Sequence, residues 1–387
     1  MSMSGMTAIA GIGQTEFSKE SGRSELQLAC EAVKAAIDDA GLKPSDIDGM
    51  VTFTMDSSDE IEIARNVGIG DLTFFSRVHH GGGAAAGTVV QAAMAVATGT
   101  ADAVVCYRAF NERSGFRFGG SGARPTGETP LFMANYAPFG LLTPAAWVAL
   151  HAQRYMSTYG VTNEDFGRIS VVDRAHAARN PDAWFYERPI TLGDHQKSRW
   201  VIEPVLRLLD CCQESDGGVA LVVTSAERAR DLRQAPAIIT AAAQGATFDS
   251  ETMTSYYRDD ITGLPEMGVV AEKLWRDSGL TPTDIQTAFL YDHFTPFVFA
   301  QLEELGFCGR GDAKDFATIE RLSLGGELPI NTNGGLLGEA YIHGMNGITE
   351  SVRQLRGTSC NQVDAVQHVL VTAGTGVPTS GLILSQA

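Results

Sequence analysis

An internal duplication limits the fold of this chain more than any other feature of its sequence. Residues 39–47, DAGLKPSDI, end a helix-like pattern and precede a strand-like run at 50–54. Residues 277–285, DSGLTPTDI, repeat that signature and precede a second apolar run at 288–291. Glycine after the last periodic residue is typical of a helix end, and the runs that follow favour strands. Two copies of one helix–turn–strand signature predict a fold of two similar halves.

A second correspondence supports the duplication. In the first half, a helical pattern of small residues at 84–98 leads into a strand-like run at 103–107. In the second half, a helical pattern around 348–355 leads into a strand-like run at 365–371. A glycine-rich turn precedes each of these helices. Alternating helices and strands favour a mainly parallel sheet covered on both faces, and the duplication predicts a central helical layer shared by the halves.

The middle of the chain differs from both halves. Residues 111–129 are rich in Gly, Ser, Arg and Thr, residues 132–142 are mostly apolar, and helical patterns follow from Pro144 to about 160 and at about 164–179. Such excursions from a core often line substrate sites. We expect four segments: 1–110 begins the N-terminal half, 111–214 is the excursion, 215–240 completes the N-terminal half, and 241–387 forms the C-terminal half.

Composition excludes several classes of function. The formal net charge of -17 argues against nucleic acid and anionic membrane surfaces as partners. No stretch approaches the roughly 20 apolar residues of a membrane span, and the first residues lack the pattern of a signal peptide, so we expect a cytoplasmic protein without a membrane span. The 6 cysteines are too sparse for a disulfide scaffold. We expect no metal site either, because the adjacent His79 and His80 point apart on a strand and lack carboxylate or thiol partners.

Several separated motifs carry a family resemblance. They are LDCC at 209–212 with SDGG at 215–218, LYDHF at 290–294, NGGL at 333–336 and VQH at 366–368. In this order, and over nearly the whole chain, they resemble the thiolase superfamily, and its sterol-carrier-type branch most. The resemblance implies an α/β protein with the five-layered αβαβα thiolase fold and duplicated halves, commonly a homodimer.

The position of the family's nucleophile is the first departure from that pattern. Counted back from GTAD at 99–102, the nucleophilic cysteine of thiolases falls on Gly82. A thiolase needs a thiolate to carry the acyl group, and glycine has none. A slip of one residue does not restore it, because residues 79–86 contain no thiol or hydroxyl.

Two further family positions have changed together. Tyr291 stands at an oxyanion-hole histidine position, Tyr341 stands at the catalytic histidine, and the loop at 372–376 lacks the family's second cysteine. A phenol donates hydrogen bonds well to an enolate oxygen, and it can act as a base when a neighbouring histidine lowers its pKa. These changes suit enolate chemistry without a covalent intermediate.

The resemblance narrows the function further. Members of this branch without the cysteine are similar to bacterial steroid side-chain aldolases, also called lipid-transfer proteins. That similarity implies retro-aldol cleavage of a 17-hydroxy steroid with a three-carbon acyl-CoA side chain, to a 17-ketosteroid and propionyl-CoA. It implies no cofactor. It also implies a partner, the small zinc-ribbon and OB-fold domain of a hydratase subunit.

The candidate site residues follow from the resemblance. We expect Tyr291 and Tyr341 to be the base and the enolate-stabilising or proton-donating group, with the assignment between them open. Further candidates are His293 and His343 for catalysis, and Gly82, Gly83 and Asn333 for substrate binding. Ordinary roles compete: a tyrosine that ends a strand commonly just packs, and His343 can simply open a helix.

Two other functions stay open at this point. A true thiolase requires an acylatable cysteine, so iodoacetamide would abolish its activity. A non-catalytic acyl-CoA or lipid carrier requires neither tyrosine, so replacing both by phenylalanine would leave its behaviour unchanged. The substrate's identity depends on the resemblance alone, because the apolar residues at 132–142 and around Trp147 fit a bulky pocket and ordinary core packing equally well.

Overall fold

The computed structural model describes residues 3–79, 81–115, 117, 136–251, 255–374, 376 and 379–387. Nine strands there form one sheet in the order β3-β2-β4-β7-β1-β8-β11-β10-β9. Their bounds are β1 (Thr7–Gln14), β2 (Gly49–Phe53), β3 (Phe74–Val78), β4 (Ala103–Asn111), β7 (Asp216–Ser225), β8 (Ala237–Gly245), β9 (Thr287–Phe289), β10 (His368–Ala373) and β11 (Thr379–Gln386). The first five belong to the N-terminal half and the last four to the C-terminal half.

The two halves repeat one pattern of strand pairing, which confirms the duplication. In the first half β2 pairs parallel with β4, β4 pairs antiparallel with β7, and β7 pairs antiparallel with β1. The second half repeats these directions: β9 pairs parallel with β10, β10 pairs antiparallel with β11, and β11 pairs antiparallel with β8. The halves meet where β1 pairs with β8, through Ala8 with Ile238 and Ile9 with Ala237.

The sheet is mixed, so the prediction of a mainly parallel sheet was wrong. Parallel pairs join β2 to β3, β2 to β4 and β9 to β10, and the other pairs among the described strands are antiparallel. A strand that is buried on both faces gives the same apolar run in either direction. The run at 103–107 therefore could not reveal that β4 pairs with β7, a strand more distant in sequence.

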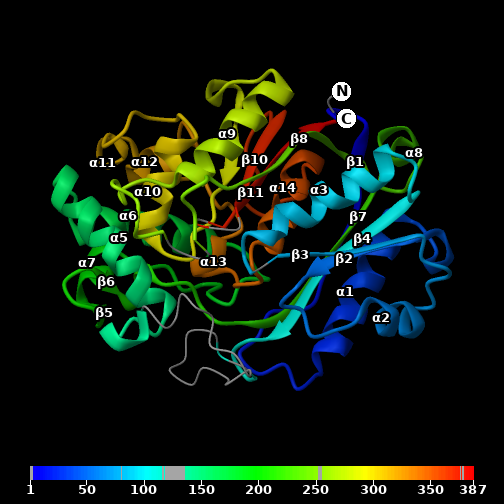
Figure 1. The fold of residues 1–387 in the computed structure, drawn as a ribbon, viewed down its shortest axis with the longest axis horizontal. Helices are drawn as coiled ribbons and strands as arrows, with labels where there is room; N and C mark the ends of the chain where they lie inside the picture. The colour runs from blue at the N-terminus through cyan, green and yellow to red at the C-terminus, as the bar shows by residue number, and fades with distance from the viewer. Residues whose placement is uncertain are drawn as a thin grey trace.

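Helices cover both outer faces of the sheet and fill the space between its halves, which gives five layers (Figure 1). On the N-terminal half, α1 (Glu25–Ala40) packs against β1, β4 and β7, beside α2 (Glu60–Val67). On the C-terminal half, α9 (Pro265–Ser278) packs against β8 and β11. Between them, α3 (Ala84–Ala97) and α14 (Met345–Arg356) contact strands of both halves. The shared central layer is confirmed.

Local signals explain the ends of these helices. The Ser24 hydroxyl accepts a hydrogen bond from the Gln27 backbone and begins α1, and Gly41 ends it in the left-handed conformation with φ +75°. The small residues of α3 allow the central layer to pack tightly. A Cβ atom at Gly87, for example, would lie 3.0 Å from the Val78 side chain on β3 and 2.9 Å from Gln244 on β8.

The excursion forms a helical lobe over the C-terminal half. Its elements and those that pack with them are α5 (Pro144–Tyr159), α6 (Asn163–Ala177), α7 (Leu192–Lys197), β5 (Trp200–Ile202), β6 (Leu206–Arg207), α10 (Thr295–Glu304), α11 (Ala313–Phe316), α12 (Ile319–Leu322) and α13 (Gly335–Gly338), with α8 (Ala226–Arg230) following β7 in the N-terminal half. As predicted, α5 begins at Pro144 after a Thr143 cap and ends before Gly160. Most of the glycine-rich stretch 111–129 and part of 132–142 lie outside the described residues. The division into four segments stays a prediction.

No helix in the described part of the chain combines the length and the apolar character needed to cross a membrane.

Candidate active site

Two tyrosines from different parts of the C-terminal half meet in the core. Tyr291 follows β9, and Tyr341 lies between α13 and α14. Their hydroxyl oxygens are 2.9 Å apart, within hydrogen-bond distance, and their rings meet edge to face with centroids 6.3 Å apart. The structure thus brings together the two residues that the sequence singled out as a pair.

Backbone hydrogen bonds fix the position of Tyr291. Its N–H donates to Thr372 Oγ1 at the end of β10 (2.9 Å) and to Gln301 Oε1 in α10 (3.2 Å). Gln301 Nε2 donates in turn to the Tyr291 carbonyl oxygen (2.9 Å). The side chain is only 2% exposed. Two separate elements, β10 and α10, therefore hold this tyrosine in one place.

The Tyr341 backbone is anchored to the strand connection of the other half. Its N–H donates to Ser215 Oγ (3.2 Å), and residue 341 forms a parallel bridge with Glu214. Asp292 follows Tyr291 in the chain. Its carboxylate accepts hydrogen bonds from the N–H groups of Leu336 (2.9 Å) and Leu337 (3.0 Å) in α13, the helix that precedes Tyr341. The two tyrosines are therefore linked through the backbone as well as through their hydroxyl groups.

Gly82 makes room for the Tyr291 side chain. A Cβ atom at position 82 would lie 1.6 Å from the Tyr291 hydroxyl oxygen and 2.3 Å from its Cζ. A Cβ at Gly344 would also lie close to the ring, 3.0 Å from Tyr291 Cε2. No side chain at position 82 is compatible with Tyr291 in this place. Tyr291 in this position therefore requires a glycine at position 82, and a glycine there cannot be a nucleophile.

Gly83 caps the N-terminus of α3 just beyond Gly82, and its carbonyl oxygen accepts a hydrogen bond from Ser380 Oγ (2.6 Å). This bond ties the glycine turn of the N-terminal half to β11 of the C-terminal half.

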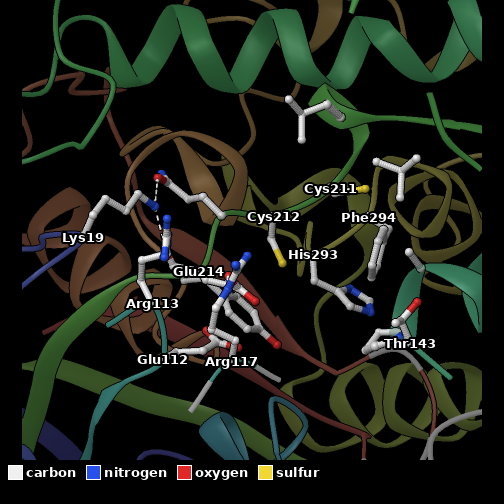
Figure 2. Close-up of a pocket in the computed structure, with 16 residues that line it drawn as sticks. Lys19, Glu112, Arg113, Arg117, Thr143, Cys211, Cys212, Glu214, His293 and Phe294 are labelled. Carbon is white, nitrogen blue, oxygen red and sulfur yellow. Dashed lines mark hydrogen bonds and ion pairs between the residues drawn. The ribbon is translucent and has the colours of Figure 1, made fainter. Parts of the chain in front are cut away.

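A cavity of about 360 Å³ reaches Tyr341, one member of the tyrosine pair. Tyr341 forms part of its wall, together with residues that follow β4, lie between 211 and 214 or precede α10: Glu112, Cys212, Gln213, His293 and Phe294. Figure 2 shows its two sides, with the basic side chains of Lys19, Arg113 and Arg117 gathered on one and His293, Phe294 and Thr143 on the other. Glu112 and Glu214 lie among the three cations of this cationic side, where Arg117 pairs with Glu214, and the other side is largely apolar (Figure 2).

Both tyrosines are protonated at neutral pH. Burial raises the pKa of Tyr291 and of Tyr341 well above the ordinary value of 10. Neither tyrosine therefore has the lowered pKa that a phenol needs to act as a base at neutral pH. Burial lowers the pKa of His293 to about 3, so its imidazole is neutral and supplies no positive charge to the pair.

The two candidate histidines occupy different places. His293 lines the cavity, stacks on Phe297 with ring centroids 5.3 Å apart, and lies 4.9 Å from the Tyr291 ring, centroid to centroid. His343 packs against Tyr341 at 5.1 Å between centroids and is not among the lining residues. Arg108 Nε donates to its Nδ1 (3.2 Å). Because a guanidinium group only donates, Nδ1 carries no proton.

Asn333 lies away from the cavity. Its Nδ2 donates to the Glu339 carboxylate, its Oδ1 accepts from the Gly335 N–H (3.1 Å), and Asn180 donates to its carbonyl oxygen (3.0 Å). These bonds shape the turn before α13. A role for Asn333 in substrate binding stays a prediction.

The prediction that the chain has no metal site rested partly on His80, which lies outside the described residues. Within the described ranges, no group of three or more His, Cys, Asp or Glu side chains is placed to hold a metal ion.

Sequence reasoning missed the polar residues on the cationic side. Glu112 was missed because the strand was expected to end at 107, whereas β4 continues to Asn111 and places Glu112 just beyond a strand end, where sites in α/β sheets gather. Lys19 donates to Gln213 Oε1 (2.7 Å), and burial lowers its pKa to about 8. Neither residue belongs to a recognisable motif.

Cys211 and Cys212 are the thiols among the residues that line the cavity, and Cys212 is the one whose charge would act on both tyrosines. Burial raises its pKa well above 9, so it is a thiol at neutral pH. Reactive cysteines instead have lowered pKa values in electropositive surroundings. Cys212 therefore does not replace the missing nucleophile.

Comparisons with known proteins identify the family. Residues 246–385 match a family model described as thiolase C-terminal domain-like. The chain is 69% identical to a steroid side-chain-cleaving aldolase of Thermomonospora curvata, over 98% of each chain. It is 66% identical to a 17-hydroxy-3-oxo-4-pregnene-20-carboxyl-CoA lyase of Mycobacterium tuberculosis, over 99% of this chain and 100% of the relative.

Solved structures give the same picture of the fold. A structure described as Ltp2-ChsH2(DUF35) aldolase superposes with a TM-score of 0.95 at 67% identity, and the match covers 100% of this chain and 99% of that one. Human mitochondrial 3-ketoacyl-CoA thiolase superposes with a TM-score of 0.68 at 15% identity, over 99% of each chain. The second match shows the fold alone, which is the five-layered thiolase fold.

Proposed function

Because the chain belongs to the thiolase superfamily, as a member of its steroid side-chain-cleaving aldolases, we propose that it cleaves a 17-hydroxy steroid acyl-CoA by a retro-aldol reaction. The products are a 17-ketosteroid and propionyl-CoA. The observation that supports this mechanism is the position of the Tyr291 hydroxyl group. It occupies the space that the side chain of a nucleophile at position 82 would need. An enzyme arranged in this way works without an acyl-enzyme.

The reaction requires three events. The 17-hydroxyl group loses its proton, the bond between C17 and the α-carbon of the thioester breaks, and the electron pair of that bond leaves as a thioester enolate. The enolate then takes a proton at the α-carbon. Catalysis therefore needs a group that stabilises the enolate oxygen and groups that move two protons.

The tyrosine pair suits the stabilising role. Both phenols are neutral, and Tyr341 faces the cavity while Tyr291 supports it through the 2.9 Å hydrogen bond. Two linked hydroxyls polarise one another, so the outer one donates more strongly to a developing negative charge. Removing one such donor from an oxyanion site typically costs about 10²- to 10³-fold in kcat. We propose that Tyr341 contacts the substrate and that Tyr291 orients and polarises it.

We propose that His293 receives the hydroxyl proton, because its ring lines the cavity and lies 4.9 Å from the Tyr291 ring, centroid to centroid. His343 lies behind Tyr341 and, through its bond to Arg108, acts as a positioning residue. Arg108 is itself fixed by a buried ion pair with Asp56 (2.9 Å).

The two sides of the cavity match the two parts of an acyl-CoA steroid. Phosphate groups of CoA are anionic, and Lys19, Arg113 and Arg117 outnumber the one carboxylate, Glu214, that pairs with Arg117 on this side of a protein whose net charge is -17. The aromatic and apolar residues on the other side suit steroid rings. We propose that the thioester lies between them, next to Tyr341.

We also propose that the chain acts as a homodimer bound to the zinc-ribbon and OB-fold domain of a hydratase subunit. The solved relative that names ChsH2(DUF35) beside Ltp2 supports a partner of this kind. A cytoplasmic location is consistent with 6 free cysteines. Light scattering of the chain with and without the partner domain tests the assembly: a dimer that binds the partner supports it, and a monomer that binds nothing contradicts it.

Product analysis tests the function itself. The chain and its partner domain are incubated with the 17-hydroxy steroid acyl-CoA and the products are identified by mass spectrometry. We expect ketone and propionyl-CoA, with no effect of iodoacetamide. Acyl transfer that iodoacetamide abolishes would favour a thiolase, and binding without turnover would favour a carrier.

A further inference from the structure

Glu112 is a buried carboxyl group in the cavity for which the reaction as described so far has no use. It follows β4 directly, lines the cavity with Tyr341, and is only 4% exposed. Its Oε2 has no hydrogen-bond partner among the described residues. A buried, unpaired carboxyl oxygen is costly to a protein unless a ligand completes its bonding.

The backbone around Glu112 is rigid. On one side, the Asn111 N–H donates to Glu25 Oε1 (3.0 Å). On the other, the N–H groups of Arg113 (2.9 Å) and Ser114 (3.0 Å) donate to Asp216 Oδ1. The carboxyl group is therefore held at the cavity wall by contacts that do not use its own oxygens.

Burial favours the protonated form of the Glu112 carboxyl group. It raises the pKa of Glu112 well above the ordinary value, with Glu214 and Asp216 acting in the same direction, against Arg108 and Lys19. A carboxylic acid that stays protonated at neutral pH is a hydrogen-bond donor and a ready source of a proton.

We propose that Glu112 is a further catalytic residue, the acid that protonates the α-carbon of the departing thioester enolate. This role rests on the proposed retro-aldol function. The 17-hydroxyl proton passes to the base beside the tyrosine pair, the C17–α-carbon bond breaks, and its electron pair forms the new α-carbon–hydrogen bond with the proton from Glu112. The proton taken from the hydroxyl group then returns to the Glu112 carboxylate, so the enzyme ends as it began.

Glu112→Gln tests the proposal because it keeps the shape of the side chain and removes the acidic proton. We expect kcat for ketone release to fall by about 10²- to 10⁴-fold, with KM little changed. Glu112→Asp keeps an acid and should retain part of the activity. Glu266→Gln is the matched control: Glu266 is equally buried and its pKa is also raised, but it pairs with Arg258 (2.9 Å) away from the cavity. We expect full turnover from that variant.

A partial reaction separates this proposal from the proposed function. Propionyl-CoA and a 17-ketosteroid are incubated in D₂O with the chain and its partner domain, and deuterium at the α-carbon is measured by mass spectrometry. We expect exchange with the wild-type chain and its loss in Glu112→Gln. Exchange at the wild-type rate in Glu112→Gln overturns the acid role even if the wild type cleaves the substrate. Absence of ketone from the forward reaction overturns the function, whatever the exchange shows.

Discussion

The hydroxyl oxygens of Tyr291 and Tyr341 lie 2.9 Å apart, and the first of them occupies the space that any side chain at position 82 would need. The loss of a nucleophile and the gain of a phenol are therefore sterically coupled. A chain that had merely lost thiolase activity would have no reason to place two buried hydroxyl groups at the point where an enolate oxygen would form.

Restoring a side chain at position 82 should damage the site. Gly82→Ala places a Cβ 1.6 Å from the Tyr291 oxygen, and such overpacking typically costs about 1–3 kcal/mol. We expect a lower free energy of unfolding in urea and loss of turnover. Combining Gly82→Ala with Tyr291→Ala should cost less than the sum of the two single changes, because the clash is removed. Strict additivity would contradict the steric coupling.

The two tyrosines should behave as one unit. We expect Tyr291→Phe and Tyr341→Phe each to lower kcat by about 10²- to 10³-fold, and the double variant to be little worse than either, because each phenol acts through their shared hydrogen bond. Steady-state kinetics in the complex with the partner domain measure this. Unchanged kcat in both single variants would remove the tyrosines from the mechanism.

Cys212 should be dispensable for chemistry. Because burial raises its pKa well above 9, we expect slow alkylation by iodoacetamide at pH 7. Cys212→Ala should retain cleavage within a few fold of the wild-type rate. A loss of activity as large as that expected for the tyrosine variants, together with an acylated protein mass in the wild type, would instead indicate covalent catalysis.

Glu112 should make stability depend on pH in a defined direction. Its pKa is raised on folding, so between the ordinary value of 4.5 and the higher folded value the folded state holds a proton that the unfolded state has released. The free energy of unfolding therefore falls as pH rises through that window, by up to about 1.4 kcal/mol per pH unit. In Glu112→Gln the side chain does not titrate, so this pH dependence is absent. We therefore expect the free energy of unfolding of the variant, relative to that of the wild type, to be higher at pH 8 than at pH 5.5. Urea unfolding at both values measures the difference, and an equal difference at both would contradict a raised pKa.

Much of the scaffold could be predicted from local signals. The start of α1 at its Ser24 cap, its end at Gly41 and the Pro144 start of α5 follow from capping chemistry that a few neighbouring residues determine. The duplication was visible because both halves keep the same turn. The direction of β7 relative to β4 was not, because apolar runs carry no information on strand direction.

The site was predicted in part. The positions of Tyr291 and Tyr341 followed from the family pattern, but the direction of their pKa shifts did not, because it depends on burial by residues from several elements. Glu112 was missed for a related reason. Its place on the cavity wall is fixed by long-range contacts of its neighbours with Glu25 and Asp216, which no local motif records.

The central claim is that a hydrogen-bonded pair of tyrosines cleaves a carbon–carbon bond without an acyl-enzyme. Its most direct test is mass spectrometry of both products and protein after one incubation of the partner-bound chain with the 17-hydroxy steroid acyl-CoA. The account predicts 17-ketosteroid and propionyl-CoA in equal amounts, an unmodified protein mass, and a fall of about 10²-fold or more in both products for Tyr291→Phe. An acylated protein mass, or undiminished product from Tyr291→Phe, would contradict it.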